Sequence, residues 1–309
     1  MNVLELTGQT PIVELEHCSP KPGVRLFAKL EGQNPTGSVK DRIVSFMLNR
    51  ARLDGRLEPG QDVVEATTGN TGIALAMAGK RLGHPVRLVV PETAFTDVTR
   101  SLKAWEPTIE WVAADLGIKS AIERAKDIAR LDGAYLLNQF ESPDNPLCHY
   151  ETTAAEILTQ MPEIDVFVCG LGTSGTAMGV GRRLKEVNPQ IRVVVAEPFP
   201  GQSLQGIRSL EDGYVPPILD LDLLDGKIVV RSADAFRAVR EMLRRDGVLG
   251  GLSAGAVLHA ALKVASRLDS ANIVMLFADS GWKYLNSPAF RLDDSLEDPD
   301  EAFDEVLWW

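Results

Sequence analysis

Short apolar runs alternate with stretches of helical period along most of the chain. Runs such as "VRLVVP" (86–91), "VFVC" (166–169) and "NIVMLF" (272–277) have the length of strands, and the stretches between them carry apolar residues at helical spacing. Parallel strands that are covered by helices on both faces produce this pattern. About eight such units exceed one doubly wound sheet, so we predict two doubly wound α/β domains.

Three local predictions follow from the same periodicities. In "DRIVSFMLNRARLDG" the spacing predicts a helix that ends at Gly55 and has Ile43, Phe46, Met47 and Leu53 near one face. The run "YLLNQF" (135–140) predicts a strand. The Pro-rich stretch 141–146 predicts the division between the two domains.

Composition excludes several classes of protein. The 309 residues are 45% hydrophobic and 24% charged, a composition that is typical of a globular protein. Of the net charge of −11, eight charges lie in the segment 293–305, so the remainder is nearly balanced and has no basic stripe for nucleic acid. No apolar run has the length of a membrane span, and the first residues do not resemble a secretory signal. We therefore expect a cytoplasmic protein with neither a nucleic-acid nor a membrane partner.

Cysteine and histidine usage gives no sign of a metal site. Cys18, Cys148 and Cys169 are an odd number of cysteines at wide spacing, which suits neither a disulfide framework nor metal ligation. Cys169 lies within an apolar strand pattern, so we expect it to be packed in the core. None of the four histidines has the H-E-x-x-H spacing.

The stretch "GLGTSG" that follows "DVFVC" matches G-x-G-x-x-G through Gly170, Gly172 and Gly175. Glu197 stands 22 residues further on, where dinucleotide-binding folds place an acidic residue. By itself the motif is consistent with a nicotinamide dinucleotide, as in an NAD-dependent dehydrogenase. A ligand with a single phosphate would satisfy it equally well.

Three Gly-rich loops follow predicted strands: "EATTGNTG" (65–72), "GLGTSGT" (170–176) and "GGLSAGA" (250–256). Each opens a predicted helix, whose free N–H groups attract anions, and each carries hydroxyl side chains. Ordinary N-capping explains any one of these loops. Three in one chain favour a ligand with several anionic or polar groups.

Lys40 stands in "NPTGSVKDR", just inside a predicted helix start. The helix dipole disfavours a cation there and would lower the pKa of the amine, which suits a nucleophilic lysine. An exposed surface lysine is the alternative.

Five motifs in this order resemble the cysteine synthase family: "NPTGSVKDR", "TTGNTG", "NQFESPDNPLCHY", "GLGTSGT" and "GLSAGA". The resemblance covers residues 5–290 and is greatest for the cysteine synthase B and O-phosphoserine sulfhydrylase branches, which "GIRSLEDGYVP" also favours. It implies a pyridoxal-phosphate enzyme of fold type II, like the tryptophan synthase β chain, and a homodimer. A larger cofactor-binding domain would hold 1–36 and 146–292, a smaller mobile substrate-binding domain 37–145, and 293–309 would form an acidic tail.

The resemblance also implies roles for individual residues. Lys40 would form the internal aldimine, Asn70 would bond the 3′-oxygen of pyridoxal 5′-phosphate, and Ser253 would face its pyridine nitrogen. The phosphate would lie on Gly172, Thr173, Ser174, Gly175 and Thr176. The substrate carboxylate would lie on Thr67, Thr68, Thr71 and Gln139. The family usually has serine where Thr68 stands, so an added methyl group narrows the expected pocket.

The implied reaction is β-replacement. O-acetylserine or O-phosphoserine would lose its leaving group to give an aminoacrylate, with Lys40 as general base, and a sulfur donor would add to form L-cysteine. We predict that Arg208 selects an anionic leaving group; an ion pair with Glu211 or Asp212 is the alternative. A serine/threonine dehydratase and a cystathionine β-synthase remain alternatives of the same fold.

The acidic tail 293–309 ends in Val-Leu-Trp-Trp. Acidic segments are normally solvated, but two terminal tryptophans favour docking on an apolar surface. Family members with similar tails resemble synthases that are supplied by a thiocarboxylated sulfur-carrier protein. We therefore expect the tail to fold back over the active-site cleft, shield the intermediate and meet such a carrier. Docking on a neighbouring subunit and disorder are the alternatives.

Overall fold

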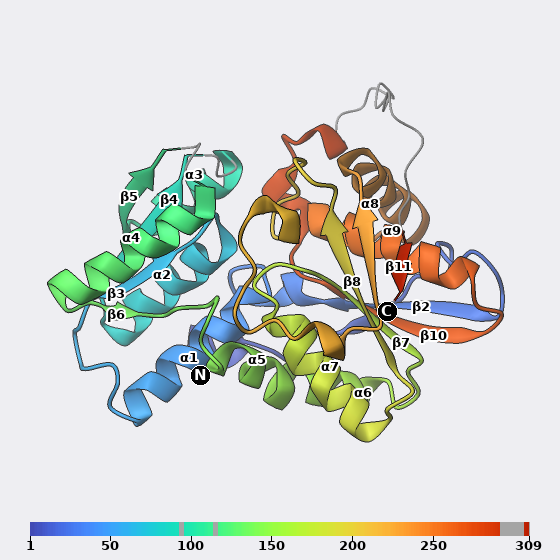
Figure 1. The fold of residues 1–309 in the computed structure, drawn as a ribbon, viewed down its shortest axis with the longest axis horizontal. Coiled ribbons are helices and arrows are strands. Elements are labelled where there is room, and N and C mark those ends of the chain that lie inside the picture. The colour runs from blue at the N-terminus through green and yellow to red at the C-terminus, as the bar shows by residue number, and fades with distance from the viewer. Residues whose placement is uncertain (93–95, 114–116, 291–305, 309) are drawn as a thin grey trace.

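A computed structural model describes residues 1–92, 96–113, 117–290 and 306–308. The described chain forms two sheets with helices on both faces of each, as Figure 1 shows. The prediction of two doubly wound α/β units is confirmed. No helix among the described residues is both long enough and apolar enough to cross a membrane.

The larger lobe is built on a seven-stranded sheet in the order β1-β2-β10-β7-β8-β9-β11. The strands are β1 (Ile12–Glu14), β2 (Val24–Leu30), β7 (Val166–Gly170), β8 (Arg192–Pro198), β9 (Gly226–Val230), β10 (Ala271–Phe277) and β11 (Val306–Trp308). The central strands from β2 to β9 run parallel, and the two edge strands pair antiparallel. The carboxyl ends of the central strands therefore lie along one edge, where open α/β sheets bind ligands.

The helices of the larger lobe are α5 (Asp144–Cys148), α6 (Ala154–Gln160), α7 (Gly175–Val187), α8 (Ser232–Asp246) and α9 (Leu252–Ser266). Alternate residues of each central strand face opposite sides. In β7, Val166 and Val168 pack in the core that contains α9, whereas Phe167 and Cys169 pack in the core that contains α7. The continuous apolar runs seen in the sequence are thus buried on both faces. Cys169 is fully buried, as predicted.

The smaller lobe is built on a four-stranded parallel sheet in the order β5-β4-β3-β6. Its strands are β3 (Val63–Ala66), β4 (Val86–Pro91), β5 (Thr108–Val112) and β6 (Tyr135–Leu136), and its helices are α2 (Asn70–Leu82), α3 (Thr96–Ala104) and α4 (Gly117–Asp132). The strand predicted over 135–140 is much shorter than expected. Asn138 has φ 61°, a left-handed conformation that ends the extended backbone before the Gln139 turn.

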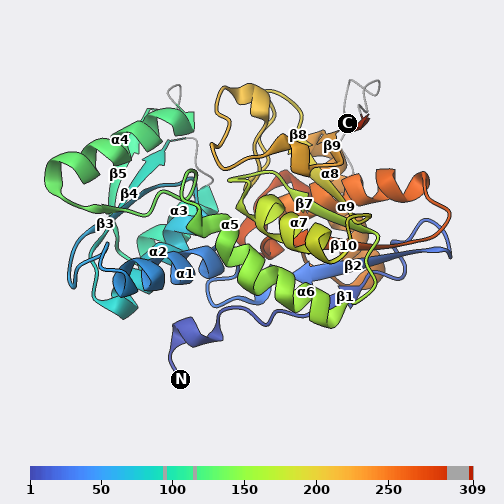
Figure 2. The ribbon, with the colours of Figure 1, turned by 60° about the horizontal axis from the view of Figure 1, so that its bottom comes forward.

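Helix α1 (Lys40–Leu53) lies at the junction of the lobes and packs on α2 and α5 (Figures 1 and 2). Ile43 and Met47 are buried, as the sequence predicts, but the prediction for Leu53 is wrong, since 90% of it is exposed. At about 100° per residue, Leu53 lies roughly 80° around the helix from Ile43, outside the contact face.

The end of the chain does not follow the prediction of a tail over the cleft. Residues 306–308 pair antiparallel with β9, and Trp308 stands opposite Gly226, the first residue of that strand. The ligand edge of the sheet is at the other end of β9. For these residues the prediction is therefore wrong, because the free edge of β9 offers backbone hydrogen bonds to a terminal strand. The rest of the tail, 291–305 and 309, lies outside the described residues.

Candidate active site

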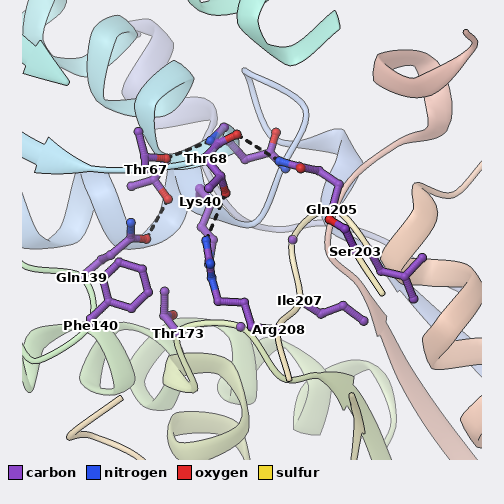
Figure 3. A pocket seen from close by; sticks show the side chains of 16 residues that line it. Lys40, Thr67, Thr68, Gln139, Phe140, Thr173, Ser203, Gln205, Ile207 and Arg208 are labelled. Carbon is purple, nitrogen blue, oxygen red and sulfur yellow. Dashed lines mark hydrogen bonds between the residues drawn. The ribbon is translucent and has the colours of Figure 1, made fainter. Parts of the chain in front are cut away.

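Two adjoining pockets lie between the lobes at the carboxyl ends of the strands. Figure 3 shows the first, with Lys40 and Arg208 facing the loop of Thr67 and Thr68. The second lies beside it, and both pockets share six lining residues: Lys40, Asn70, Gly172, Thr173, Gly206 and Ile207. The structure brings almost all the predicted site residues to these walls. Thr67, Thr68, Thr71, Gln139 and Arg208 line the first pocket, and Ser174, Thr176 and Ser253 line the second.

Four helix N-termini converge on the second pocket, among them that of α1, which begins at Lys40. Helices α2 and α7 begin at Asn70 and Gly175, and Ser253 is the second residue of α9. Free N–H groups and the helix dipole give each of these ends a partial positive charge. Asp279 is the one carboxylate among the described residues that line either pocket. The arrangement therefore favours an anionic ligand.

The loop before α7 has the features of a phosphate cradle. Ser174 has φ 73°, and its hydroxyl is buried without a hydrogen-bond partner among the described residues. Gly172 approaches the backbone of Gly206, because a Cβ there would lie 2.7 Å from the Gly206 carbonyl oxygen. Gly175 does not line either pocket; a Cβ on it would lie 1.9 Å from Asn145 Oδ1. The residues present therefore fit the phosphate group of pyridoxal phosphate.

Two threonine hydroxyls of this loop have buried partners behind them. Thr173 Oγ1 accepts a hydrogen bond of 3.1 Å from Asn145, which leaves its own O–H free to donate into the pocket. Thr176 Oγ1 lies 3.3 Å from Nε2 of His149. His149 is buried, and desolvation together with the charges of Lys40 and Arg42 holds its pKa well below the usual range, so the ring is neutral.

Lys40 is the first residue of α1, as predicted. Its pKa is lowered to about 8, but the main cause differs from the one expected. Burial lowers the pKa most, the charge of Arg208 lowers it further, and Asp279 opposes both. Removal of the amine from water and the neighbouring guanidinium therefore lower this pKa.

Hydrogen bonds hold the wall of the first pocket in place. Thr71 Oγ1 donates to Gln139 Oε1 at 2.7 Å, and Gln139 Nε2 donates to the carbonyl of Ala66 at 3.0 Å. Thr67 Oγ1 accepts from the backbone of Gly69 at 3.0 Å. Hydroxyl donors and the N-terminus of α2 thus surround a space suited to a carboxylate.

Glu65 lies behind this wall and accepts hydrogen bonds from the backbone of Ala66 and Gln139. Burial raises its pKa from 4.5 to about 7, although these bonds oppose the shift. Between these two pH values the folded protein retains a proton that the unfolded chain releases, so the free energy of unfolding falls as pH rises through this window. The contribution is on the order of 3 kcal/mol.

We expect Glu65→Gln to remove this part of the pH dependence, because glutamine stays neutral. Urea unfolding of the wild type and the variant at pH 5 and pH 8 measures the difference. Equal loss of stability in both proteins between these pH values would show that Glu65 does not titrate in this range.

Arg208 projects into the first pocket beside Lys40 (Figure 3), where Nη2 lies 3.3 Å from Thr68 Oγ1. The ion pair with Glu211 or Asp212 that the sequence left open is not formed: no carboxylate among the described residues lies within salt-bridge distance of Arg208. Burial lowers the pKa of this guanidinium, and the charges of Asp212 and Tyr214 oppose that shift from beyond salt-bridge distance.

The acidic residue of the dinucleotide motif, Glu197, makes contacts inside the larger lobe. Glu197 is fully buried, accepts hydrogen bonds from Ser209 and Leu210, and forms an ion pair of 3.1 Å with Lys227. It is therefore not free to bind a ribose. Within the part of the chain that the structure describes, no three His, Cys, Asp or Glu side chains gather as a metal site.

Two residues that contact Asn70 were not identified from the sequence. Asp279 follows β10 and lines the second pocket, and Lys283 lies in the 3₁₀ turn Gly281–Tyr284. Both bond to Asn70. The signal for Asp279 was available, since "FADSG" directly follows a strand of the parallel sheet; Lys283 carried no comparable signal.

Comparisons with known proteins agree with this site. The family model described as pyridoxal-phosphate dependent enzyme matches residues 3–279. Cysteine synthase B of Salmonella typhimurium is 37% identical over 292 residues, which cover 94% of this chain and 96% of that protein.

Solved structures give the same result. The structure of an O-ureido-L-serine synthase matches with a TM-score of 0.89 and 32% identity, covering 94% of this chain and 96% of its own. A cysteine synthase of Entamoeba histolytica matches with a TM-score of 0.87 and 34% identity, covering 95% and 91%. The chain therefore belongs to the pyridoxal-phosphate-dependent enzymes and, within them, to the cysteine synthase family.

Proposed function

We propose that this cysteine synthase takes O-phosphoserine as its activated serine. The observation that carries the proposal is Arg208, a guanidinium that lies beside Lys40 in the substrate pocket without an acidic partner among the described residues. A phosphate dianion gains more from such a group than a neutral acetyl ester does, because the contact is charge-assisted and bidentate geometry is available.

Pyridoxal phosphate, when bound, supplies the electron sink that permits loss of a proton from Cα and of the leaving group from Cβ. We propose that Lys40 holds the cofactor covalently and, once displaced, takes the Cα proton. Its lowered pKa supports this role, because an amine near pKa 8 is a usable base at neutral pH. Thr173, Ser174 and Thr176 would donate to the phosphate, with Gly172 giving access to the backbone and Gly175 making room for Asn145 behind the loop.

Ser253 would face the pyridine nitrogen. Its side chain is buried in the second pocket at the N-terminus of α9. A neutral hydroxyl does not stabilise a protonated ring as a carboxylate does, which favours elimination over transamination. Thr67, Thr68, Thr71 and Gln139 would bind the α-carboxylate of the substrate.

Two contacts join the lobes across the first pocket. Gln205 Nε2 donates to the carbonyl of Thr68 at 3.1 Å, and Arg208 reaches the hydroxyl of the same residue. We propose that the segment 37–145 forms the smaller domain, that its part beyond α1 moves, and that these contacts form on closure. Closure excludes water, which would otherwise compete with the sulfur donor.

We expect Arg208→Ala to lower kcat/KM for O-phosphoserine by roughly tenfold to a hundredfold, the effect of one lost charge-assisted contact. The value for O-acetylserine should change several times less. Steady-state cysteine formation with sulfide measures both, and Arg208→Lys, which keeps the charge, should recover part of the loss. Equal losses for the two substrates would contradict a role in selecting the leaving group.

The likeness to cysteine synthases is the basis on which we propose the partners. We propose a homodimer in the cytoplasm, which light scattering on the purified chain and cell fractionation would test. A thiocarboxylated carrier protein is proposed as a sulfur donor beside sulfide. Faster turnover with a carrier thiocarboxylate than with an equal concentration of sulfide is the expected result.

A further inference from the structure

We propose that Lys283 and Asp279 hold the side-chain amide of Asn70 in one orientation, so that it presents an N–H donor, and not its carbonyl oxygen, to the cofactor. The inference rests on the proposed binding of pyridoxal phosphate in these pockets. It concerns two positioning residues, which act through Asn70.

Each end of the Asn70 amide has a partner of defined polarity. Lys283 Nζ donates to Asn70 Oδ1 at 2.7 Å, and Asn70 Nδ2 donates to Asp279 Oδ2 at 2.7 Å. An ammonium group has only donors and an ionised carboxylate has only acceptors. Rotating the amide by 180° would place N–H against the ammonium and a carbonyl oxygen against the carboxylate. The two contacts therefore determine which end is nitrogen.

The arrangement around Asp279 supports this polarity. Asp279 is 3% exposed, and its Oδ2 accepts a second hydrogen bond, from the hydroxyl of Tyr284. An oxygen that accepts two donors is not the protonated one. Asp279 Oδ1 lies beside Gly251 at the start of α9, because a Cβ on Gly251 would lie 2.0 Å from it. Burial raises the pKa of this carboxyl, and Oδ1 has no hydrogen-bond partner among the described residues. Oδ2 remains an acceptor in either protonation state, because it already accepts from Asn70 and Tyr284.

The second amide hydrogen of Asn70 has Tyr284 as its partner inside the protein. Nδ2 carries two hydrogens and gives one to Asp279, and the Asn70 side chain also bonds the Tyr284 hydroxyl. Asn70 is the first residue of α2 and lines both pockets, so an acceptor on a ligand would take this second hydrogen in competition with Tyr284. The matching ligand atom is a hydrogen-bond acceptor, and the phenolic 3′-oxygen of the cofactor is of this kind.

The same segment also fixes the start of α1. Asp279 forms a β-bridge with Ser38, and the amide of Val39 donates to the carbonyl of Ala278 at 2.8 Å. Lys40 follows directly. The end of β10 in the larger lobe thus positions Asn70 through side chains and Lys40 through the backbone.

The test compares the affinity of the apoenzyme for two probes, pyridoxal 5′-phosphate and 3-O-methylpyridoxal 5′-phosphate, by equilibrium dialysis. The methyl ether cannot carry the negative charge of the phenolate, so it gains little from the donor. Lys283→Met removes the donor at Oδ1, so only the contact with Asp279 still opposes rotation of the amide. We expect this variant to bind pyridoxal phosphate about tenfold more weakly and the ether nearly as well as the wild type does.

Three further variants test the same inference. Lys283→Arg keeps a donor, so it should keep the wild-type preference for pyridoxal phosphate over the methyl ether. Asp279→Ala should lower this preference. Trp282→Ala, at a neighbouring side chain that is 71% exposed, is the matched control and should change neither affinity. Equal weakening of both probes in Lys283→Met would mean that Lys283 is merely structural and would overturn the inference. Failure of the wild type to bind pyridoxal phosphate would instead overturn the proposed function.

Discussion

Replacing Lys40 by alanine should reduce the rate of cysteine formation on the order of 10⁴-fold, the upper range for loss of a positioned acid–base group. The amine lies at the start of α1 between the two pockets, where burial and Arg208 lower its pKa to about 8. Lys40→Ala also loses the proposed covalent link. Borohydride reduction followed by mass spectrometry should place the cofactor on the Lys40 peptide of the wild type only.

Lys80→Ala is the control for Lys40→Ala, because Lys80 is an exposed residue of α2 that pairs with Glu106. It should retain wild-type turnover and the reducible linkage. If Lys40→Ala kept a borohydride-reducible cofactor at full occupancy, another lysine would carry the cofactor and the assignment would be wrong.

Arg42→Met should lower the free energy of unfolding by about 3–5 kcal/mol, the effect of leaving a buried charge without its partner. Arg42 Nε lies 2.6 Å from Glu31 and Nη1 lies 2.7 Å from Glu156. Glu31 and Arg42 are both buried, whereas Glu156 has a second partner in Lys29 at 2.7 Å. Loss of the guanidinium therefore affects Glu31 most. Urea unfolding monitored by circular dichroism measures the change.

Arg50→Met is the matched control in the same helix. Arg50 pairs with Asp144 at 3.0 Å, but its side chain is 48% exposed, so we expect less than about 1 kcal/mol. Similar losses in Arg42→Met and Arg50→Met would show that the buried cluster does not hold α1 to the larger lobe.

Local chemistry explains which parts of the site could be predicted from the sequence. Glycine and hydroxyl residues directly after apolar strands identify loops at the carboxyl edge of a parallel sheet, and the fold brings those loops together. The resemblance then assigned each loop a group of the cofactor or substrate. Gly172, Thr173, Asn70 and Ser253 lie at the pocket walls for this reason.

Other features depend on tertiary contacts that no short pattern records. Glu197 matched a dinucleotide motif, but the fold buries it against Lys227 and Ser209. Lys283 has no motif, and its contact with Asn70 joins residues 213 positions apart. The lowered pKa of Lys40 was expected, but its main causes are burial and Arg208, which only the assembled pocket provides.

The position of the end of the chain also depends on tertiary structure that the sequence pattern does not give. Its composition indicated an apolar end that seeks a surface, but several surfaces could satisfy that requirement. The unpaired edge of β9 receives residues 306–308, and sequence periodicity does not identify which strand lies at an edge.

The most direct test of the central claim is product analysis of the purified chain with pyridoxal phosphate, O-phosphoserine and sulfide. We expect L-cysteine to form in stoichiometric amounts with phosphate release, with little pyruvate and with a higher kcat/KM for O-phosphoserine than for O-acetylserine. Pyruvate as the main product would identify a dehydratase. Absence of cysteine with either activated serine would contradict β-replacement by this site.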